Sequence, residues 1–88
     1  MLFMDDFIKN NSIAIIYFTN SKFSTLNTKI HGLNSNKIMF IDTDNELDII
    51  EKLNIKSVPL FYIYKNETLI EEIFGTYTNI CDIIRLHL

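Results

Sequence analysis

The chain has 88 residues, which is the size of one small globular domain, and a second domain is excluded because domains seldom fall below about 50 residues. With 48% hydrophobic and 22% charged residues, it has the composition of a folded protein and not of a disordered one. A net charge of -3 with only eight lysines and arginines excludes a basic stripe for direct nucleic-acid binding, and a single cysteine excludes an internal disulfide.

The first third of the chain alternates helix and strand patterns. Apolar residues at helical spacing predict a short amphipathic helix over residues 2–10. The apolar run over residues 12–18 is rich in branched and aromatic side chains, which predicts a central strand of a parallel sheet, buried on both faces. A polar loop follows at residues 19–22. The apolar spacing over residues 23–30 then predicts a second short helix that stops at Gly32.

The middle of the chain repeats this alternation. A second apolar run predicts a strand over residues 37–42. Asp44 is placed to cap the N-terminus of a third helix. Three apolar residues of that helix are expected to face the core: Leu47, Ile50 and Leu53. The order up to this point is helix, strand, helix, strand, helix.

A hairpin is predicted next. The only proline, Pro59, stands at the mouth of a strand over residues 57–64, where a missing N–H group is tolerated. A tight turn at residues 65–67 separates this strand from another over residues 68–74. The two strands are therefore expected to form an antiparallel hairpin at one edge of the sheet, which Gly75 ends.

A last helix closes the chain, and it carries the only thiol. Its apolar stripe comprises Tyr77, Ile80, Cys81, Ile84 and Leu88. Thr78 is placed to cap it. The place of Cys81 on this stripe favours a buried, inert side chain over a one-cysteine redox or glutathionylation site.

The order of these elements and several stretches of sequence resemble the thioredoxin-like superfamily. Residues 53–59, with the sequence LNIKSVP, closely resemble the family's "gly-ile-arg-ser-ile-pro" segment, and the likeness continues over residues 61–66 and 74–75. Residues 41–44 resemble a strand end of the family, and residues 15–19 resemble the strand that leads into its active-site loop. The resemblance spans nearly the whole chain. The second helix and its exit loop are shortened by about two turns.

This resemblance implies an α/β fold, the thioredoxin-like three-layer α/β/α sandwich. Its central sheet is expected to have about four strands, which are a parallel βαβ unit and a C-terminal antiparallel hairpin. The peptide bond between Val58 and Pro59 is expected to be cis, since an X-Pro bond adopts this form at a cost of only about 0.5 to 1 kcal/mol. The whole chain, residues 1–88, is expected to be a single domain of this kind.

The two catalytic cysteines of the family are absent. Counting on from Phe18, the CxxC positions fall on residues 23–26, so that Phe23 and Leu26 replace the two sulfurs. A register two residues earlier places Ser21 and Ser24 there instead. Serine hydroxyls do not perform disulfide exchange, which needs a thiolate. Either register predicts a chain without catalytic residues.

Two other catalytic parts of the family also lack a counterpart. Tyr17 stands where thioredoxins have the buried acid that assists proton transfer. The kink proline of the helix that follows CxxC is missing, because Pro59 is the only proline. The sequence therefore favours a protein that is not an enzyme.

The binding parts of the family do carry over. By resemblance, the Val58-Pro59 loop exposes backbone N–H and C=O groups that can pair with an extended peptide or a thiol cofactor. Gly75 lines the same groove, where a side chain would obstruct the ligand. The alternative for both Pro59 and Gly75 is that they only preserve the fold. Phe23 is either an exposed aromatic anchor for a partner or the first core residue of its helix.

No metal site is predicted. His31 and His87 are far apart in the sequence and have no cysteine or acid at metal-ligand spacing. An acidic run lacks the glycine and the distal glutamate of a calcium loop, so it is interpreted as a solvated helix start: Asp42, Asp44, Glu46 and Asp48.

The chain is expected to be cytoplasmic or otherwise intracellular. Residues 1–6 carry acids where a signal peptide has basic residues, and they contain no cleavage site. The apolar runs are far shorter than the roughly 20 residues that a membrane helix needs. Sixteen isoleucines and ten asparagines indicate an A+T-rich source genome.

Three functions follow from this sequence. The first is a redox-inactive module that binds another protein, as a small subunit or adaptor of a larger assembly. The second is a glutaredoxin-like module that binds glutathione or a peptide, with Lys22 as the only nearby cation for a glutathione carboxylate. The third is a thiol-disulfide oxidoreductase that acts through Cys81. The residues expected to contact the partner or ligand are Ser21, Lys22, Phe23, Ser24, Val58, Pro59 and Gly75.

Overall fold

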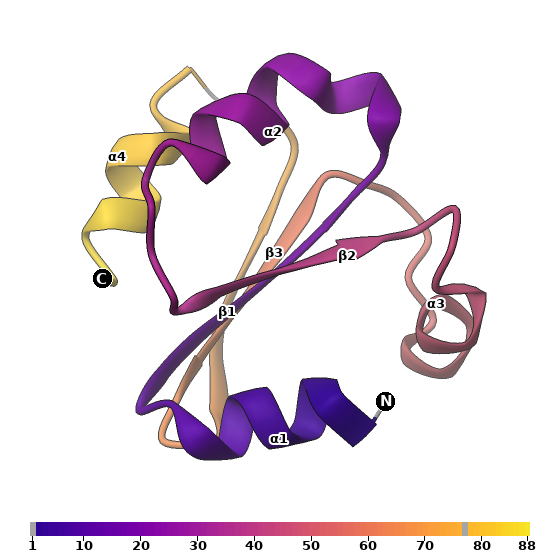
Figure 1. The fold of residues 1–88 in the computed structure, drawn as a ribbon, viewed down its shortest axis with the longest axis vertical. Coiled ribbons are helices and arrows are strands. Elements are labelled where there is room, and N and C mark those ends of the chain that lie inside the picture. Colours follow the sequence, from indigo (N-terminus) through magenta and orange to yellow (C-terminus); the bar gives the residue numbers. More distant parts are fainter. Residues whose placement is uncertain (1, 77) are drawn as a thin grey trace.

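The computed structural model describes residues 2–76 and 78–88 as a four-stranded mixed sheet with helices on both faces (Figure 1). The elements in chain order are α1 (Leu2–Asn10), β1 (Ile13–Thr19), the 3-10 turn η1 (Ser21–Phe23), α2 (Ser24–His31), β2 (Ile38–Asp42), α3 (Leu47–Leu53), β3 (Leu60–Lys65), β4 (Thr68–Phe74) and α4 (Ile80–Arg85). The predicted α/β/α sandwich with a central sheet of four strands is confirmed.

Strand β1 lies inside the sheet, whose order is β2-β1-β3-β4. It pairs with β2 in parallel and with β3 antiparallel, and β3 and β4 form the predicted hairpin. Every residue of β1 after Ile13 is buried. The uninterrupted apolar pattern of β1 therefore correctly predicted a strand with both faces covered. The sheet is mixed, since β1 and β2 are its one parallel pair.

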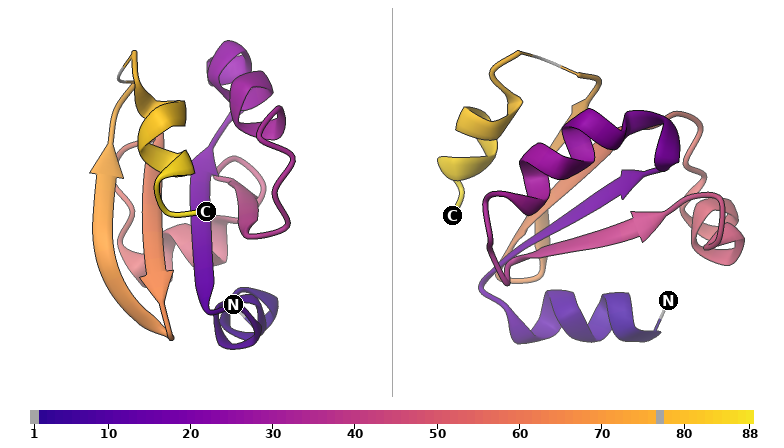
Figure 2. Two further views of the ribbon diagram at one scale, coloured as in Figure 1. Left: turned by 90° about the vertical axis from the view of Figure 1, so that its left-hand side faces the viewer. Right: turned by 45° about the horizontal axis from the view of Figure 1, so that its top comes forward.

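The two faces of the sheet carry separate cores, because successive side chains of a strand point to opposite faces. Figure 2 shows α2 and α4 on one face and α1 and α3 on the other. The core under α2 and α4 comprises Ile15, Tyr17, Leu26, Ile30, Phe61, Ile63, Ile73, Ile80 and Ile84. The core under α1 and α3 comprises Met4, Ile8, Ala14, Ile16, Phe18, Ile41 and Ile49. None of the helices described is long and apolar enough to cross a membrane.

Helix α3 differs from the prediction in its cap and in its inward face. Asp44 does not cap it; the carboxylate of Asp42 instead accepts the N–H of Asp44 at 2.9 Å and the side-chain amide of Asn45 at 2.8 Å. Because this turn precedes it, the helix begins only at Leu47. Its buried residue is Ile49 and not Leu47. Leu47 is 64% exposed, so its predicted inward position was wrong. Ile50 and Leu53 are half-buried and pack against the core, as predicted.

Helix α4 is shorter than predicted, at six residues, and Thr78 does not cap it. Asn79 precedes the first helical residue, and its side chain makes no capping hydrogen bond. Ile80 and Ile84 are buried and Cys81 is half-buried, so the inner part of the predicted stripe is confirmed. Tyr77 lies outside the described residues. A six-residue helix has room for one inward stripe of two side chains, which leaves Leu88 37% exposed.

The hairpin turn holds two residues other than glycine in the left-handed region. Asn66 has a φ of 49° and Glu67 a φ of 69°. Two-residue hairpin loops favour this conformation because its twist matches that of the strands, but they normally use Asn-Gly. Asn66 tolerates the left-handed region, whereas the Cβ of Glu67 is crowded there.

Replacing Glu67 with glycine is expected to raise the free energy of unfolding by about 1 kcal/mol, because the steric cost of a left-handed Cβ is removed. Urea unfolding checks this. Glu67→Ala is the matched control: it removes the carboxylate but keeps the Cβ, and it should remain within about 0.5 kcal/mol of the wild type. A gain in the alanine variant equal to that in the glycine variant would contradict the steric explanation.

Burial raises the pKa of three tyrosines above their ordinary value. For Tyr17 the cause is its place in the core, where its ring stacks on Phe61 with centroids 4.3 Å apart. The pKa of Tyr62 and of Tyr64 is raised first by burial and then by neighbouring charge, including that of Glu72. The folded chain therefore holds these phenolic protons more tightly than the unfolded chain does.

Stability should consequently be retained below pH about 10, the pKa of an unfolded tyrosine, and should fall as the pH rises through the raised values. Each tyrosine adds a slope of at most about 1.4 kcal/mol per pH unit. Urea unfolding from pH 8 upward measures the slope, and Tyr17→Phe should reduce it. An unchanged slope in that variant would show that Tyr17 does not contribute.

Candidate functional site

Three loops meet at one end of the sheet. Phe18 pairs with Leu60, and Leu60 pairs with Phe74, so the end of β1, the start of β3 and the end of β4 lie side by side. The residues that follow or precede these positions form the loops. Figure 1 shows them at the upper ends of the strands. The register of the sheet therefore brings the Phe23 loop, Pro59 and Gly75 to the same end of the molecule.

Asparagine side chains order the loop after β1. The side-chain oxygen of Asn20 accepts the N–H of Lys22 at 2.9 Å, which starts η1. The Oδ1 atom of Asn27, on α2, accepts the hydroxyls of Tyr17 at 2.8 Å and Thr19 at 2.7 Å. Its Nδ2 atom donates to the carbonyl of Asn20 at 2.9 Å. Asn27 thus ties the helix, the loop and the end of β1 together.

This network contains no ionised group. Tyr17 stands where the resemblance implies a buried acid, and burial raises the pKa of its phenol, so it keeps its proton at neutral pH. Its hydroxyl donates a hydrogen bond to the amide oxygen of Asn27, which is an uncharged acceptor. Sequence reasoning missed Asn27. No local pattern indicated it, because Asn27 finds its partners on β1 and in the loop, seven to ten residues earlier in the chain.

The start of α2 places Phe23 and Leu26 against the core. Phe23 ends η1 and immediately precedes Ser24, the first residue of α2. Phe23 is half-buried and packs on the core under α2 and α4, while Leu26 is 9% exposed. Ser21 and Ser24 are exposed. Of the two alternatives for Phe23, packing on the core is what the structure shows, with the ring left partly accessible; its role as an anchor for a partner stays a prediction.

The Val58-Pro59 segment lies next to Gly75. The peptide bond between Val58 and Pro59 is cis, Pro59 is buried, and its carbonyl accepts the N–H of Gly75 at 3.0 Å. Val58 is half-buried and packs on the core under α1 and α3. Within the described residues, no backbone hydrogen bond engages the N–H or the carbonyl of Val58.

Gly75 is required by its backbone conformation. Its φ is 101°, a region that side-chain-bearing residues rarely adopt. A Cβ added there would meet no atom of the chain within 4 Å. The conformation alone therefore explains the glycine, which supports the interpretation that it preserves the fold.

A surface cavity of about 330 Å³ lies between α2 and the segment that leads into α4. Its walls include the ring of Phe23, the thiol-bearing Cys81 and two lysines, Lys22 and Lys29. Cys81 was expected to be buried and inert, but it is half-buried and borders this cavity. The sequence analysis also missed Lys29 as a second cation. Lys22 lies in η1 and Lys29 on α2, so no single helical pattern indicated that the two lysines share a cavity.

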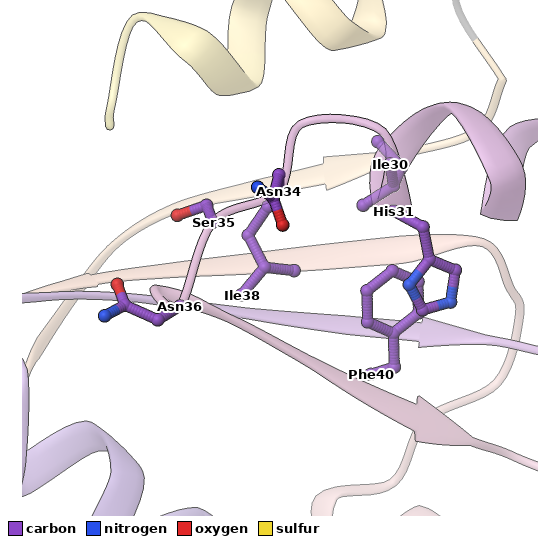
Figure 3. A pocket seen from close by; sticks show the side chains of 7 residues that line it. All are labelled: Ile30, His31, Asn34, Ser35, Asn36, Ile38 and Phe40. Carbon is purple, nitrogen blue, oxygen red and sulfur yellow. The ribbon is translucent and has the colours of Figure 1, made fainter.

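The two histidines lie at separate places. The ring of His31 stacks on Phe40 with centroids 3.9 Å apart and planes 4° from parallel, beside a cavity at the edge of the sheet (Figure 3). The Nε2 atom of His87 lies 3.0 Å from the carboxylate of Glu71 on β4. The two histidines therefore contact different elements, His31 the strand β2 and His87 the strand β4.

Comparison with known proteins supports this architecture. No protein-family model matches the sequence, and no curated protein matches it. Among solved structures, a mutant thioredoxin from Halobacterium salinarum NRC-1 has a TM-score of 0.80 and 17% identity, covering 99% of this chain and 84% of its own. The oxidised thioredoxin of Plasmodium falciparum has a TM-score of 0.78 and 21% identity, covering 98% and 90%.

Mitochondrial thioredoxin 3 from Saccharomyces cerevisiae is similar to the same degree, with a TM-score of 0.77 and 20% identity, covering 99% of this chain and 89% of its own. At these identities the likeness concerns the backbone arrangement. The element order, the sheet order and these structures agree, and the chain has the thioredoxin-like fold.

Proposed function

We propose that this chain is a redox-inactive thioredoxin-like module, a single domain, that binds another protein through the loop end of its sheet. The observation that supports this most is the start of α2. In the first register of the resemblance, Phe23 and Leu26 hold the two cysteine positions, and both side chains pack on the core; in the second register the positions fall on Ser21 and Ser24, which also carry no thiol. In this proposal the module acts inside the cell, as a small subunit or adaptor.

The chemistry of the loop end favours binding over exchange. Disulfide exchange needs a thiolate that attacks sulfur and a second thiol that resolves the mixed disulfide. The sequence has one cysteine, Cys81, and the structure places it on α4 and not at the start of α2. The neutral phenol of Tyr17 cannot serve as the base that a carboxylate provides. The chain alone therefore lacks the parts of a dithiol cycle.

The loop end also has the composition of a binding surface. The partly accessible ring of Phe23 has exposed polar neighbours, Ser21, Lys22 and Ser24. An aromatic side chain with a polar rim is the usual arrangement of an energetically dominant contact. In this proposal the N–H and carbonyl of Val58, which make no backbone hydrogen bond among the described residues, pair with an extended segment of the partner.

The second candidate is a glutathione-binding module, and the cavity beside Phe23 favours it. Two lysines, Lys22 and Lys29, line this cavity, and glutathione carries two carboxylates. Cys81 borders the same cavity, so a bound tripeptide would have its sulfur near a thiol of the protein. Binding there would be non-covalent and would need no catalytic residue.

We expect Phe23→Asp to weaken binding of the partner at least thirtyfold, because the accessible part of the ring would be replaced by a charge in the centre of the contact. The partner is first purified with the tagged wild-type chain from its native cell, and its affinity for each variant is then measured by calorimetry.

Two further variants make this measurement decisive. Phe3→Asp is the matched control, because Phe3 is 55% exposed on α1, which lies away from the loop end, and it should bind like the wild type. Lys22→Glu changes the exposed rim without touching the core and should also weaken binding. Wild-type affinity in both Phe23→Asp and Lys22→Glu would contradict the proposed surface.

Titration with reduced glutathione separates the two candidate functions. The protein-binding proposal expects no heat of binding at millimolar glutathione and no turnover with a disulfide substrate, in the wild type and in Cys81→Ser alike. Heat that is lost in Lys22→Ala and in Lys29→Ala would favour the glutathione module instead. Turnover that is lost in Cys81→Ser would overturn redox inactivity.

A further inference from the structure

The two edges of the sheet differ in their protection against pairing with another strand. Edge strand β4 carries Glu71 and Glu72, and its register is broken by an irregularity opposite Ile63 and Tyr64. Charges and bulges are the usual means by which proteins block an edge. Edge strand β2 has the sequence IMFID, with no proline, no charge before its last residue and an unbroken register with β1. β2 is therefore the unprotected edge.

The hydrogen-bonding groups that β2 presents outward can be read from its ladder with β1. The N–H of Ile15 donates to the carbonyl of Lys37 at 2.8 Å, and the N–H of Thr43 donates to the carbonyl of Thr19 at 2.9 Å. In a parallel ladder alternate residues face the neighbouring strand, so odd-numbered residues of β2 face β1. Ile38 and Phe40 thus direct their N–H and C=O groups away from the sheet. β2 ends the sheet order of the described strands, and β1 is the strand with which it pairs.

We propose that β2 pairs antiparallel with β2 of a second copy of this chain, about a two-fold axis at Met39. When the two-fold axis is perpendicular to the sheet, odd-numbered residues of one copy lie opposite odd-numbered residues of the other, and even-numbered residues lie opposite even-numbered ones. With the axis at Met39, Ile38 of each copy lies opposite Phe40 of the other. The four outward N–H groups and four outward carbonyls of these residues then form four hydrogen bonds. Each pair of side chains combines a branched and an aromatic residue, a favourable cross-strand pair.

Charge favours this antiparallel arrangement. β2 follows Lys37 at one end and finishes with Asp42 at the other. In the proposed register, Asp42 of one copy lies opposite the uncharged Asn36 of the other, so that no like charges face each other. The Lys37 amine and the Asp42 carboxylate keep the partners within their own chain, which are the carbonyl of Leu88 at 3.2 Å for Lys37 and the turn at Asp44 and Asn45 for Asp42. A parallel pairing would instead bring Lys37 next to Lys37 and Asp42 next to Asp42, which costs free energy.

The cavity beside His31 fits the side chains that a second copy would bring. It measures about 420 Å³ and is lined by Ile38, Phe40 and the residues of the loop before β2 (Figure 3). In an antiparallel pair, opposing residues point to the same face. Phe40 of the second copy would thus point to the face where this cavity opens, and its Asp42 would lie near the amide side chains of Asn34 and Asn36.

Sedimentation equilibrium of the full chain tests the pairing. We expect a reversible monomer-dimer equilibrium between micromolar and millimolar concentration. Met39→Lys and Met39→Glu each place like charges at the axis and should raise the dissociation constant about tenfold or more, whereas an equimolar mixture of the two should restore dimers. Leu69→Lys, on the edge strand β4, is the control and should dimerise like the wild type.

Cross-linking tests the register itself. Met39→Cys in a Cys81→Ser background places two thiols at facing, non-hydrogen-bonded positions, where the Cα separation of about 4.5 Å suits a disulfide. Oxidation should give a covalent dimer, while Leu69→Cys in the same background should not. A wild type that stays monomeric at every concentration overturns the proposal, as does a mixture of the two Met39 charge variants that fails to dimerise.

Discussion

The burial of β1 on both faces is the constraint on which the rest of the structure depends. Its even-numbered residues fill the core under α1 and α3, and its odd-numbered residues fill the core under α2 and α4. A shift of the register by one residue would exchange these two sets, so the position of β1 is strongly specified. Because β1 also pairs with β2 and β3, its register fixes where every loop at the candidate site begins.

Because β1 is buried on both faces, the hydroxyl groups at its end need hydrogen-bond partners inside the protein, and Asn27 provides them. The hydroxyls of Tyr17 and Thr19 lie in or at the edge of the core, and an unpaired buried hydroxyl would cost about 1 to 3 kcal/mol. One amide oxygen accepts both, and the amide nitrogen of the same side chain fixes the loop carbonyl. A buried carboxylate would require a compensating charge or a raised pKa, whereas this neutral network requires neither. The polar side chains at the end of β1 thus hold the loop in place without an ionised group.

The sequence predicted the sheet well because its signals are local. The apolar run of β1, the turn at Asn66 and Glu67, and the helical spacing of Leu26 and Ile30 each depend on a few neighbouring residues. Of the predicted inward residues of α3, Leu47 was wrong, because the turn that the Asp42 carboxylate stabilises precedes a helix that begins only at Leu47.

The candidate site was predictable only where the family resemblance covered it. Neighbours distant in sequence were not visible: Cys81 lines the same cavity as Phe23 and Lys29 because α2 and α4 lie on the same face of the sheet. The role of Asn27 depends on Tyr17, ten residues earlier, and no periodic pattern encodes such a pair. The periodicity of apolar residues indicates which face of a helix or strand is buried. It does not indicate which residue of another element packs against that face.

The two proposed surfaces are compatible because they use different boundaries of the same sheet. The loop end is formed where β1 and β4 finish and β3 begins, whereas the second copy would lie along the side of β2. An axis perpendicular to the sheet reverses the strand direction between the two copies. The two loop ends would then point in opposite directions, so that one small partner could not contact both. A dimer of this kind would bind two partner molecules, one at each end of its continuous sheet, and a gain in affinity from bivalent binding would require a partner that is itself linked or repeated.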